Sequence, residues 1–203
     1  LHHDKISRHV NLLESSDEKY ALVFSDASLI DSNGKYFQNR FIAWHLKYLS
    51  LQSGNFYDQL LDGNFIPAMS VLLKKNVIDT VGLWDEDLPY EDYDMFLRIA
   101  QKYDFLFDEE LSVKYRLHSN NTHKSGFDNS LFKIFLKHAQ VEKAQKKLQF
   151  LIESGYLANI LTTEGKTYFD KFGKKGILDY MIYYSCPRVF YRITKRALTV
   201  FSK

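Results

Sequence analysis

The sequence has little cysteine: Cys186 is the only one among 203 residues. A single cysteine excludes a disulfide within the chain and any zinc site built from cysteines. No uncharged apolar run approaches the roughly eighteen residues that a membrane-spanning helix needs, and no secretory signal segment is recognisable. These absences predict a cytoplasmic protein, with peripheral contact at the cytoplasmic face of the membrane as the alternative.

The chain also lacks a strong overall charge, because its formal net charge is only +2. The balance hides an asymmetry: residues 171–203 carry eight Lys or Arg and one acid, Asp179. From about Pro187, four basic residues share one helical stripe and apolar residues share the opposite one. The basic stripe comprises Arg188, Arg192, Lys195 and Arg196. This pattern is typical of a helix on a membrane surface, and packing on its own domain is the alternative. No nucleic-acid-binding motif accompanies the stripe, so we expect no nucleic-acid partner.

What is present is an α/β pattern followed by helices alone. We expect helices over 4–16, 40–52 and 69–76, and a helix beginning near Glu91. Residues 20–24 predict a strand with Ser25 and Asp26 at its carboxyl end, where open α/β sheets place ligands. Further expected elements are a turn at 31–35, a loop at 61–67, and strands at 105–108 and 111–117. A long helical pattern begins after Gly126.

Three carboxylates crowd the first turn of one predicted helix, in "LPYEDYDMFLRIAQKYDF" (88–105). Acids there are favoured by the helix dipole whatever their function. Asp92, however, shares a face with the apolar residues Phe96 and Ile99, whereas Arg98 falls on the other side. Asp92 is therefore expected at the edge of the buried stripe. Two interpretations remain open: the acids only stabilise the helix N-terminus, or one of them is a functional carboxylate.

Several ordered stretches together resemble one family. They are "KYALVFSDASLIDSNGK" (19–35), "GNFIPAMSVLLKKNVIDTVGLWDEDLPYEDYDMFLRIAQKY" (63–103) and "VKYRLHSNNT" (113–122). Their order is similar to that in the second half of the GT-A catalytic domain of family 2 glycosyltransferases. The resemblance implies a partial GT-A domain over 1–125 that lacks the N-terminal nucleotide-binding half, and a helical extension over 126–203. Because the chain begins with Leu1, not methionine, we expect a fragment or a processed chain.

The resemblance implies roles for particular residues. Asp92 would be the general base that takes the proton of the acceptor hydroxyl, and Glu91 would orient Asp92 or the acceptor. Trp84 would offer a stacking platform, with a core aromatic as the alternative. Arg116 and His118 would lie near the donor diphosphate, with a strand arginine and an exposed turn histidine as the alternative. Asp26 is expected to be a pocket-edge or structural acid.

His45, His123 and His138 occur singly without ligand spacing, and Asp26 and Asp31 are too far apart for a paired clamp, so we expect no metal site within this chain. The resemblance implies a divalent metal, Mn or Mg, whose ligands lie mostly outside it. It also implies inverting transfer from a nucleotide-sugar donor to a hydroxyl of a glycan or lipid-linked acceptor, in polysaccharide or glycolipid synthesis. A non-catalytic module that retains half of the transferase fold for acceptor binding or assembly is the alternative.

Overall fold

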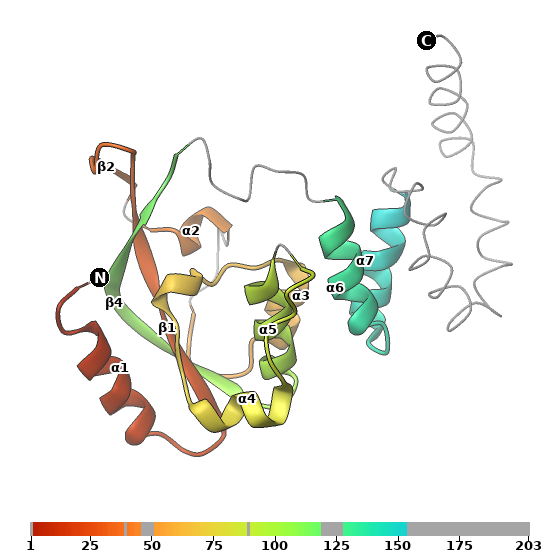
Figure 1. Ribbon diagram of the computed structural model, residues 1–203, viewed down its shortest axis with the longest axis horizontal. Helices are drawn as coiled ribbons and strands as arrows, with labels where there is room; N and C mark the ends of the chain where they lie inside the picture. The colour runs from red at the N-terminus through yellow and green to blue at the C-terminus, as the bar shows by residue number, and fades with distance from the viewer. Residues whose placement is uncertain (1, 39, 46–50, 89, 119–127, 154–203) are drawn as a thin grey trace, which may run out of the picture. The chain divides into compact units, whose positions relative to one another are not determined.

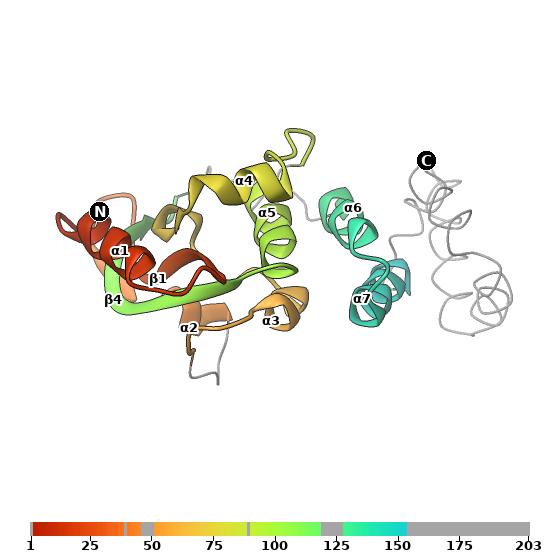
Figure 2. The same cartoon turned by 90° about the horizontal axis from the view of Figure 1, so that it is seen from below.

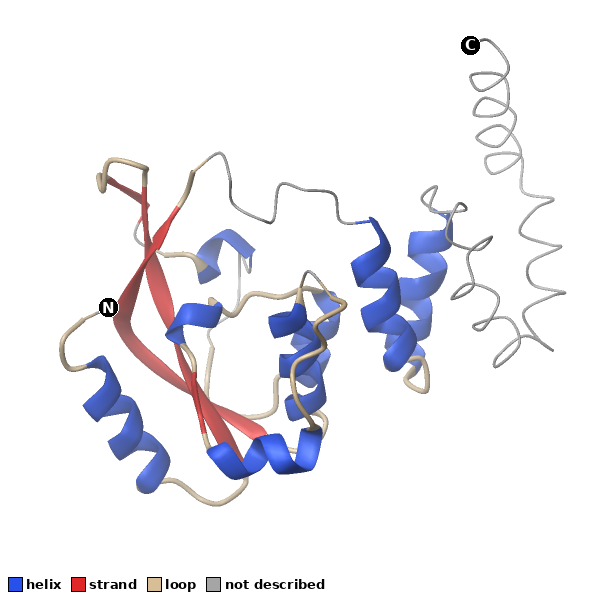
Figure 3. Cartoon of the chain, viewed as in Figure 1, coloured by secondary structure: helices blue, strands red, loops and turns tan. Residues whose placement is uncertain are grey.

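The structure is a computed structural model that describes residues 2–38, 40–45, 51–88, 90–118 and 128–153. The chain divides into two compact units, Leu1–Gly126 and Phe127–Lys203. Figure 3 shows the helices and strands of the described residues. The architecture is mixed α/β, as the sequence predicts, with strands confined to the first unit among the described residues.

Two long parallel strands form the centre of the first unit. β1 (Tyr20–Ile30) pairs with β4 (Asp104–Arg116) from Tyr20 to Ile30. Two short strands, β2 (Tyr36–Gln38) and β3 (Leu72–Leu73), pair antiparallel with opposite ends of β1. Every residue of β1 after Tyr20 is buried, which is the pattern of a strand covered on both faces.

The predicted strand at 20–24 was too short. β1 continues to Ile30, so Ser25 and Asp26 lie inside the strand and not at its carboxyl end. Their polar groups are tolerated because each has a buried partner: the Ser25 hydroxyl bonds with that of Ser112, and the Asp26 carboxylate accepts two backbone N–H groups. The polar residues Ser25 and Asp26 suggested a strand end, but pairing with β4 keeps the chain extended through them.

The two strands predicted at 105–108 and 111–117 are one strand, β4. Its pairing with β1 shifts register, because Ser25 lies opposite Asp108 whereas Ala27 lies opposite Val113. Extra residues on one strand of a pair form a bulge, which interrupts the ladder without ending the strand. The exposed acids Glu109 and Glu110 lie in this bulge, which explains why the sequence suggested two strands.

Helices lie on both sides of the β1–β4 pair (Figures 1 and 2). Helix α1 (Lys5–Glu14) lies on one side, and α3 (Tyr57–Asp62), α4 (Lys75–Val81) and α5 (Glu91–Ala100) lie on the other. The predicted helices over 4–16 and from Glu91 are confirmed, as is the turn at 31–35, where Asp31 Oδ1 accepts the N–H groups of Asn33 and Lys35.

Two other predicted helices were wrong in extent. Over 40–52 the described helix is only α2 (Ile42–His45), and residues 46–50 lie outside the described residues. Residues 69–76 contain the end of a 3-10 turn, η1 (Ala68–Ser70), then β3, and only the start of α4. Leu72 and Leu73 extend because they pair with Val23 and Leu22, a tertiary contact that helical spacing cannot reveal.

The core of the first unit is rich in aromatic rings. Phe24 of β1 lies 5.4 Å from Phe56, 6.2 Å from Phe65 and 6.5 Å from Phe105, measured between ring centroids. All three pairs meet edge to face, the arrangement that the charge distribution of aromatic rings favours. Helix α5 adds the fully buried side chains of Met95, Leu97 and Ile99. This packing anchors the helix whose first turn carries the three acids.

The described part of the second unit contains two helices, α6 (Asp128–Lys137) and α7 (Glu142–Glu153). The pattern after Gly126 predicted one long helix, but turn hydrogen bonds, His138 N–H to Phe135 and Val141 N–H to His138, separate the two. Their apolar faces bury Phe132, Ile134, Phe135, Ala144 and Leu148. The predicted basic helix from about Pro187 lies outside the described residues. Within the described residues, no helix combines the length and the apolar character needed to cross a membrane.

Candidate active site

The first turn of α5 presents its three acids in three different environments. Glu91 is exposed, Asp92 is half-buried, and Asp94 is completely buried. All three lie where the partial positive charge of the helix N-terminus favours carboxylates. Asp92 is thus the acid that is partly buried and still partly accessible to solvent, at the edge of the buried stripe as the sequence predicts.

The Asp92 carboxylate is held in place by neighbouring groups. Its Oδ1 accepts the N–H of Tyr93 at 2.7 Å, and a hydrogen bond from the Asn64 side chain also favours its charged form. Burial nevertheless raises the pKa of Asp92 above its usual value, and the negative charge of Glu91 raises it further. A carboxylate with a raised pKa is a stronger proton acceptor once it is ionised.

Tyr115 and Tyr90 lie within electrostatic range of Asp92 and were not anticipated from the sequence. Burial raises the pKa of each phenol, and the charge of Asp92 adds to both shifts. Tyr115 lies opposite Leu29 in the parallel pair, and its ring centroid is 5.0 Å from that of Phe41. The charge of Asp92 thus acts on Tyr115, which is the second-last residue of β4, and open α/β sheets usually bind ligands at the carboxyl ends of their strands.

Arg116 follows Tyr115 in β4, but its side chain binds the turn at 31–35. One terminal nitrogen donates to the carbonyl oxygens of Asp31 at 3.0 Å and Ser32 at 2.9 Å. Successive strand residues point to opposite faces, so Arg116 points to the opposite side of the strand from Tyr115. The described contacts of Arg116 thus hold the turn at 31–35. His118 is exposed beyond the end of β4.

Asp26 is buried and organises the chain that follows β2. Its Oδ1 accepts the N–H of Ala27 at 2.8 Å and that of Ile42 at 2.9 Å. Ile42 is the first residue of α2, so Asp26 satisfies a backbone donor that this helix leaves free. Its Oδ2 lies 4.0 Å from the exposed Arg40 guanidinium. Of the two expected roles, these contacts favour the structural one.

Trp84 lies in the loop between α4 and α5 and is 39% exposed, beside Leu83 at 75%. The alternative of a core aromatic is therefore wrong. The loop continues through Asp85, whose carboxylate accepts the N–H of Asp87 at 3.0 Å, to the start of α5. Trp84 is thus available to a ligand.

No group of three or more His, Cys, Asp or Glu side chains that could hold a metal ion occurs among the described residues. The acids of α5 do not form such a group, because Asp94 is turned into the protein and paired with Arg98.

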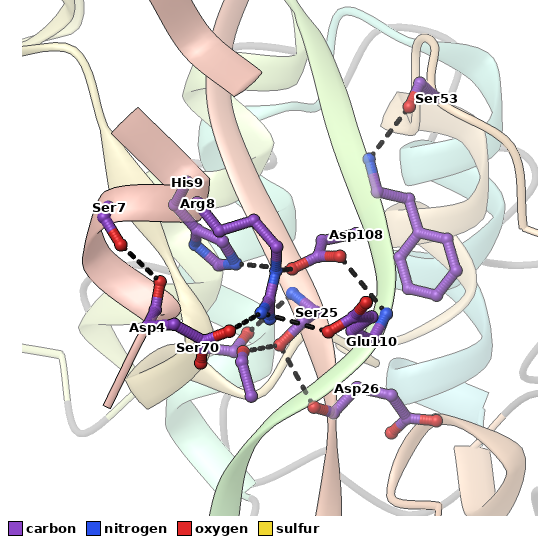
Figure 4. Close-up of polar contacts among 12 residues, drawn as sticks. Asp4, Ser7, Arg8, His9, Ser25, Asp26, Ser53, Ser70, Asp108 and Glu110 are labelled. Carbon is purple, nitrogen blue, oxygen red and sulfur yellow. Dashed lines mark hydrogen bonds and ion pairs between the residues drawn. The ribbon is translucent and has the colours of Figure 1, made fainter. Parts of the chain in front are cut away.

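A second polar cluster, also missed from the sequence, joins α1 to β4 (Figure 4). Asp108 Oδ2 accepts hydrogen bonds from Arg8 Nε at 2.8 Å and from His9 Nε2 at 3.1 Å. His9 is completely buried, and its Nδ1 has no hydrogen-bond partner. Lys5, on the same helix, is also buried. Helical spacing alone could have shown that Lys5 and His9 share a face, but not that Asp108 lies opposite.

This cluster predicts a pH-dependent stability. Burial lowers the pKa of His9 below its usual value, and the charge of nearby Lys5 lowers it further. The unfolded chain therefore binds a proton more readily, so stability is lost as pH falls below about 6.5, the unperturbed pKa of histidine. Thermal melting between pH 7.5 and pH 5 should show this loss. The His9→Gln variant should lose less, and an equal loss in both proteins would contradict the assignment to His9.

Comparison with known proteins gives one family. The model of the family described as "Glycosyltransferase like family 2" matches residues 4–154. The chain is similar to an uncharacterized glycosyltransferase of Rickettsia typhi, with 32% identity over 125 residues, which cover 59% of this chain and 37% of that protein. A relative in Rickettsia prowazekii is 25% identical over 127 residues, covering 59% and 37%. One in Rickettsia bellii is 26% identical over 125 residues, covering 60% and 17%. The chain thus spans well under half the length of these relatives.

Proposed function

Because the chain belongs to the glycosyltransferase-like family 2, we propose that it supplies the acceptor side of a glycosyltransferase site, with Asp92 as the general base. The donor would be a nucleotide sugar and the acceptor a hydroxyl of a glycan or lipid-linked saccharide. Transfer would be inverting: the acceptor oxygen attacks the anomeric carbon, the bond from that carbon to the diphosphate breaks, and Asp92 takes the hydroxyl proton. The polysaccharide or glycolipid product follows from the family resemblance alone.

The observation that carries this proposal is the environment of Asp92. It is the half-buried acid of α5, its pKa is raised by burial, and its charge acts on Tyr115 near the carboxyl end of β4. A base for a neutral hydroxyl needs an ionised carboxylate of increased basicity at a fixed position. Asn64 and Tyr93 fix that position through hydrogen bonds. Glu91, exposed in the same turn, both raises the basicity and offers a polar contact to the acceptor.

Trp84 and Leu83 would cover one side of the acceptor. An exposed indole ring presents a flat apolar face of the kind that packs against a sugar ring, and the loop that carries it leads directly into α5. Arg116 and His118 remain proposed donor contacts on the strength of the family resemblance, although the described contacts of Arg116 hold a turn. A divalent metal, Mn or Mg, would neutralise the donor diphosphate, with ligands proposed to come from parts of the relatives that this chain does not match.

A sugar-transfer assay tests the proposal. The protein at its native length is incubated with labelled nucleotide sugars, manganese and hydroxyl acceptors, and the labelled product is separated from the donor. Transfer supports the enzyme. If the protein binds an acceptor saccharide but shows neither transfer nor donor binding, the alternative of a non-catalytic acceptor-binding module is correct. Peripheral membrane contact through the basic segment after Pro187 is a separate proposal that rests on its sequence pattern.

A further inference from the structure

Arg98 makes an unusually complete set of contacts between α5 and the loop before it. One helical turn after Asp94, its Nε donates to Asp94 Oδ2 at 2.8 Å. The Asp94 side chain is 0% exposed, and that of Arg98 is 20% exposed. A buried carboxylate paired at i, i+4 fixes the guanidinium plane, because the pair can form only in a narrow range of orientations. The sequence pattern had placed Arg98 on the outer side of the helix, which is wrong.

The rest of the guanidinium binds backbone carbonyl groups of three consecutive residues. One terminal nitrogen donates to Val81 at 2.5 Å and more weakly to Gly82 at 3.4 Å, and the other donates to Leu83 at 2.9 Å. Val81 ends α4, so its carbonyl is one that the helix leaves free. Gly82 has φ of 85°, a conformation that glycine adopts at no steric cost. The chain thus turns around the guanidinium at the start of the loop.

Resting on the proposed function, we propose that Arg98 is a positioning residue for acceptor binding. It holds the first residues of the 82–88 loop against α5, the helix that also carries Asp92. Leu83, whose carbonyl Arg98 binds, and the adjacent Trp84 are exposed. The distance between these apolar acceptor contacts and the base is therefore set through one side chain. Neither Arg98 nor Asp94 contacts the reacting atoms in this proposal.

Capping the end of α4 would not require all the hydrogen bonds that Arg98 makes. Lys102, in the turn just after α5, already binds the carbonyl oxygen of Thr80 at 3.0 Å, which is ordinary capping of α4 by a cation. Arg98 instead reaches past the helix end to Gly82 and Leu83, and its planar guanidinium donates from three separate nitrogen atoms in one fixed orientation, which the single nitrogen of a lysine cannot do. Arg98→Lys is therefore the informative change, because lysine keeps the charge beside Asp94 but cannot make the fork.

The first experiment measures the accessibility of Trp84 in the loop and does not require sugar-transfer activity. The sequence has two tryptophans, Trp44 and Trp84, so Trp44→Phe leaves Trp84 as the sole reporter of the loop. In this background, Arg98→Lys should increase the acrylamide quenching constant of Trp84 about twofold, because a released surface loop admits the quencher more freely. Lys102→Met removes the neighbouring cap and should leave quenching unchanged. Equal quenching in the Arg98→Lys variant and the background protein overturns the proposal.

The second experiment measures transfer by the native-length protein. Arg98→Lys should raise the acceptor KM roughly tenfold, the usual effect of losing a charge-assisted hydrogen bond, while the donor KM stays within about twofold. Lys102→Met should change neither constant. Equal changes in both constants, or a fall in kcat alone, would overturn the positioning role. If the wild type transfers no sugar, the proposed function fails, and the quenching comparison still decides whether Arg98 holds the loop.

Discussion

Replacing Asp92 with asparagine is expected to lower kcat for sugar transfer by roughly 10²–10⁴-fold, the contribution of a positioned general base. The amide keeps the size of the side chain and can still accept the N–H of Tyr93, the bond that now measures 2.7 Å. It cannot take a proton from the acceptor hydroxyl. Steady-state rates with saturating donor and acceptor measure the effect, and the donor KM should change little.

Stability provides the control for this variant. Because burial raises the pKa of Asp92, the charged carboxylate is less favourable in the folded protein than in the unfolded chain at neutral pH. Asparagine removes that charge, so the melting temperature should stay the same or rise. Glu91→Gln is the matched variant, since it removes an adjacent but exposed acid and should cost far less activity. If kcat of the Asp92→Asn variant stays within severalfold of the wild-type value, Asp92 is not the general base.

Replacing Phe24 with alanine should lower the free energy of unfolding of the first unit by about 3–5 kcal/mol, as for other large buried aromatics. Phe24 is completely buried, and its ring meets those of Phe56 and Phe105 edge to face. The cavity would lie between β1 and the helices on the α5 side. Total stabilities of domains are only about 5–15 kcal/mol, so most of the margin would be lost.

Urea unfolding followed by circular dichroism measures this change. Phe37→Ala is the matched control, because Phe37 is 52% exposed on β2 and surface substitutions usually change stability by less than about 0.5 kcal/mol. If Phe24→Ala and Phe37→Ala differ by less than about 1 kcal/mol, Phe24 does not have the central packing role that its contacts indicate.

The sequence predicted the parts of the fold that depend on local chemistry. The acidic first turn and apolar stripe of α5 were visible from helical spacing, and the turn at 31–35 from residues that favour tight backbone geometry. The half-buried position of Asp92 followed from the same spacing. These features could be predicted because neighbours in sequence determine them.

The missed features depend on residues distant in sequence. Tyr115 was overlooked because only its position in β4, beside Leu29, brings it towards Asp92. Arg98 was assigned to the outer side because the pattern could not show that the loop at 81–83 returns to it. The length of β1 was underestimated because β4 supplies partners for its polar middle. Asp108 likewise meets Arg8 and His9 across about a hundred residues of chain.

The central claim is that ionised Asp92 accepts the acceptor proton, and the pH dependence of kcat/KM for transfer tests it most directly. Asp92 must lose its proton to act, so the rate should fall as pH decreases through a pKa raised above the ordinary 3.8. The residual activity of Asp92→Asn should lack this acidic limb. An acidic limb that is unchanged in the Asp92→Asn variant would contradict the account.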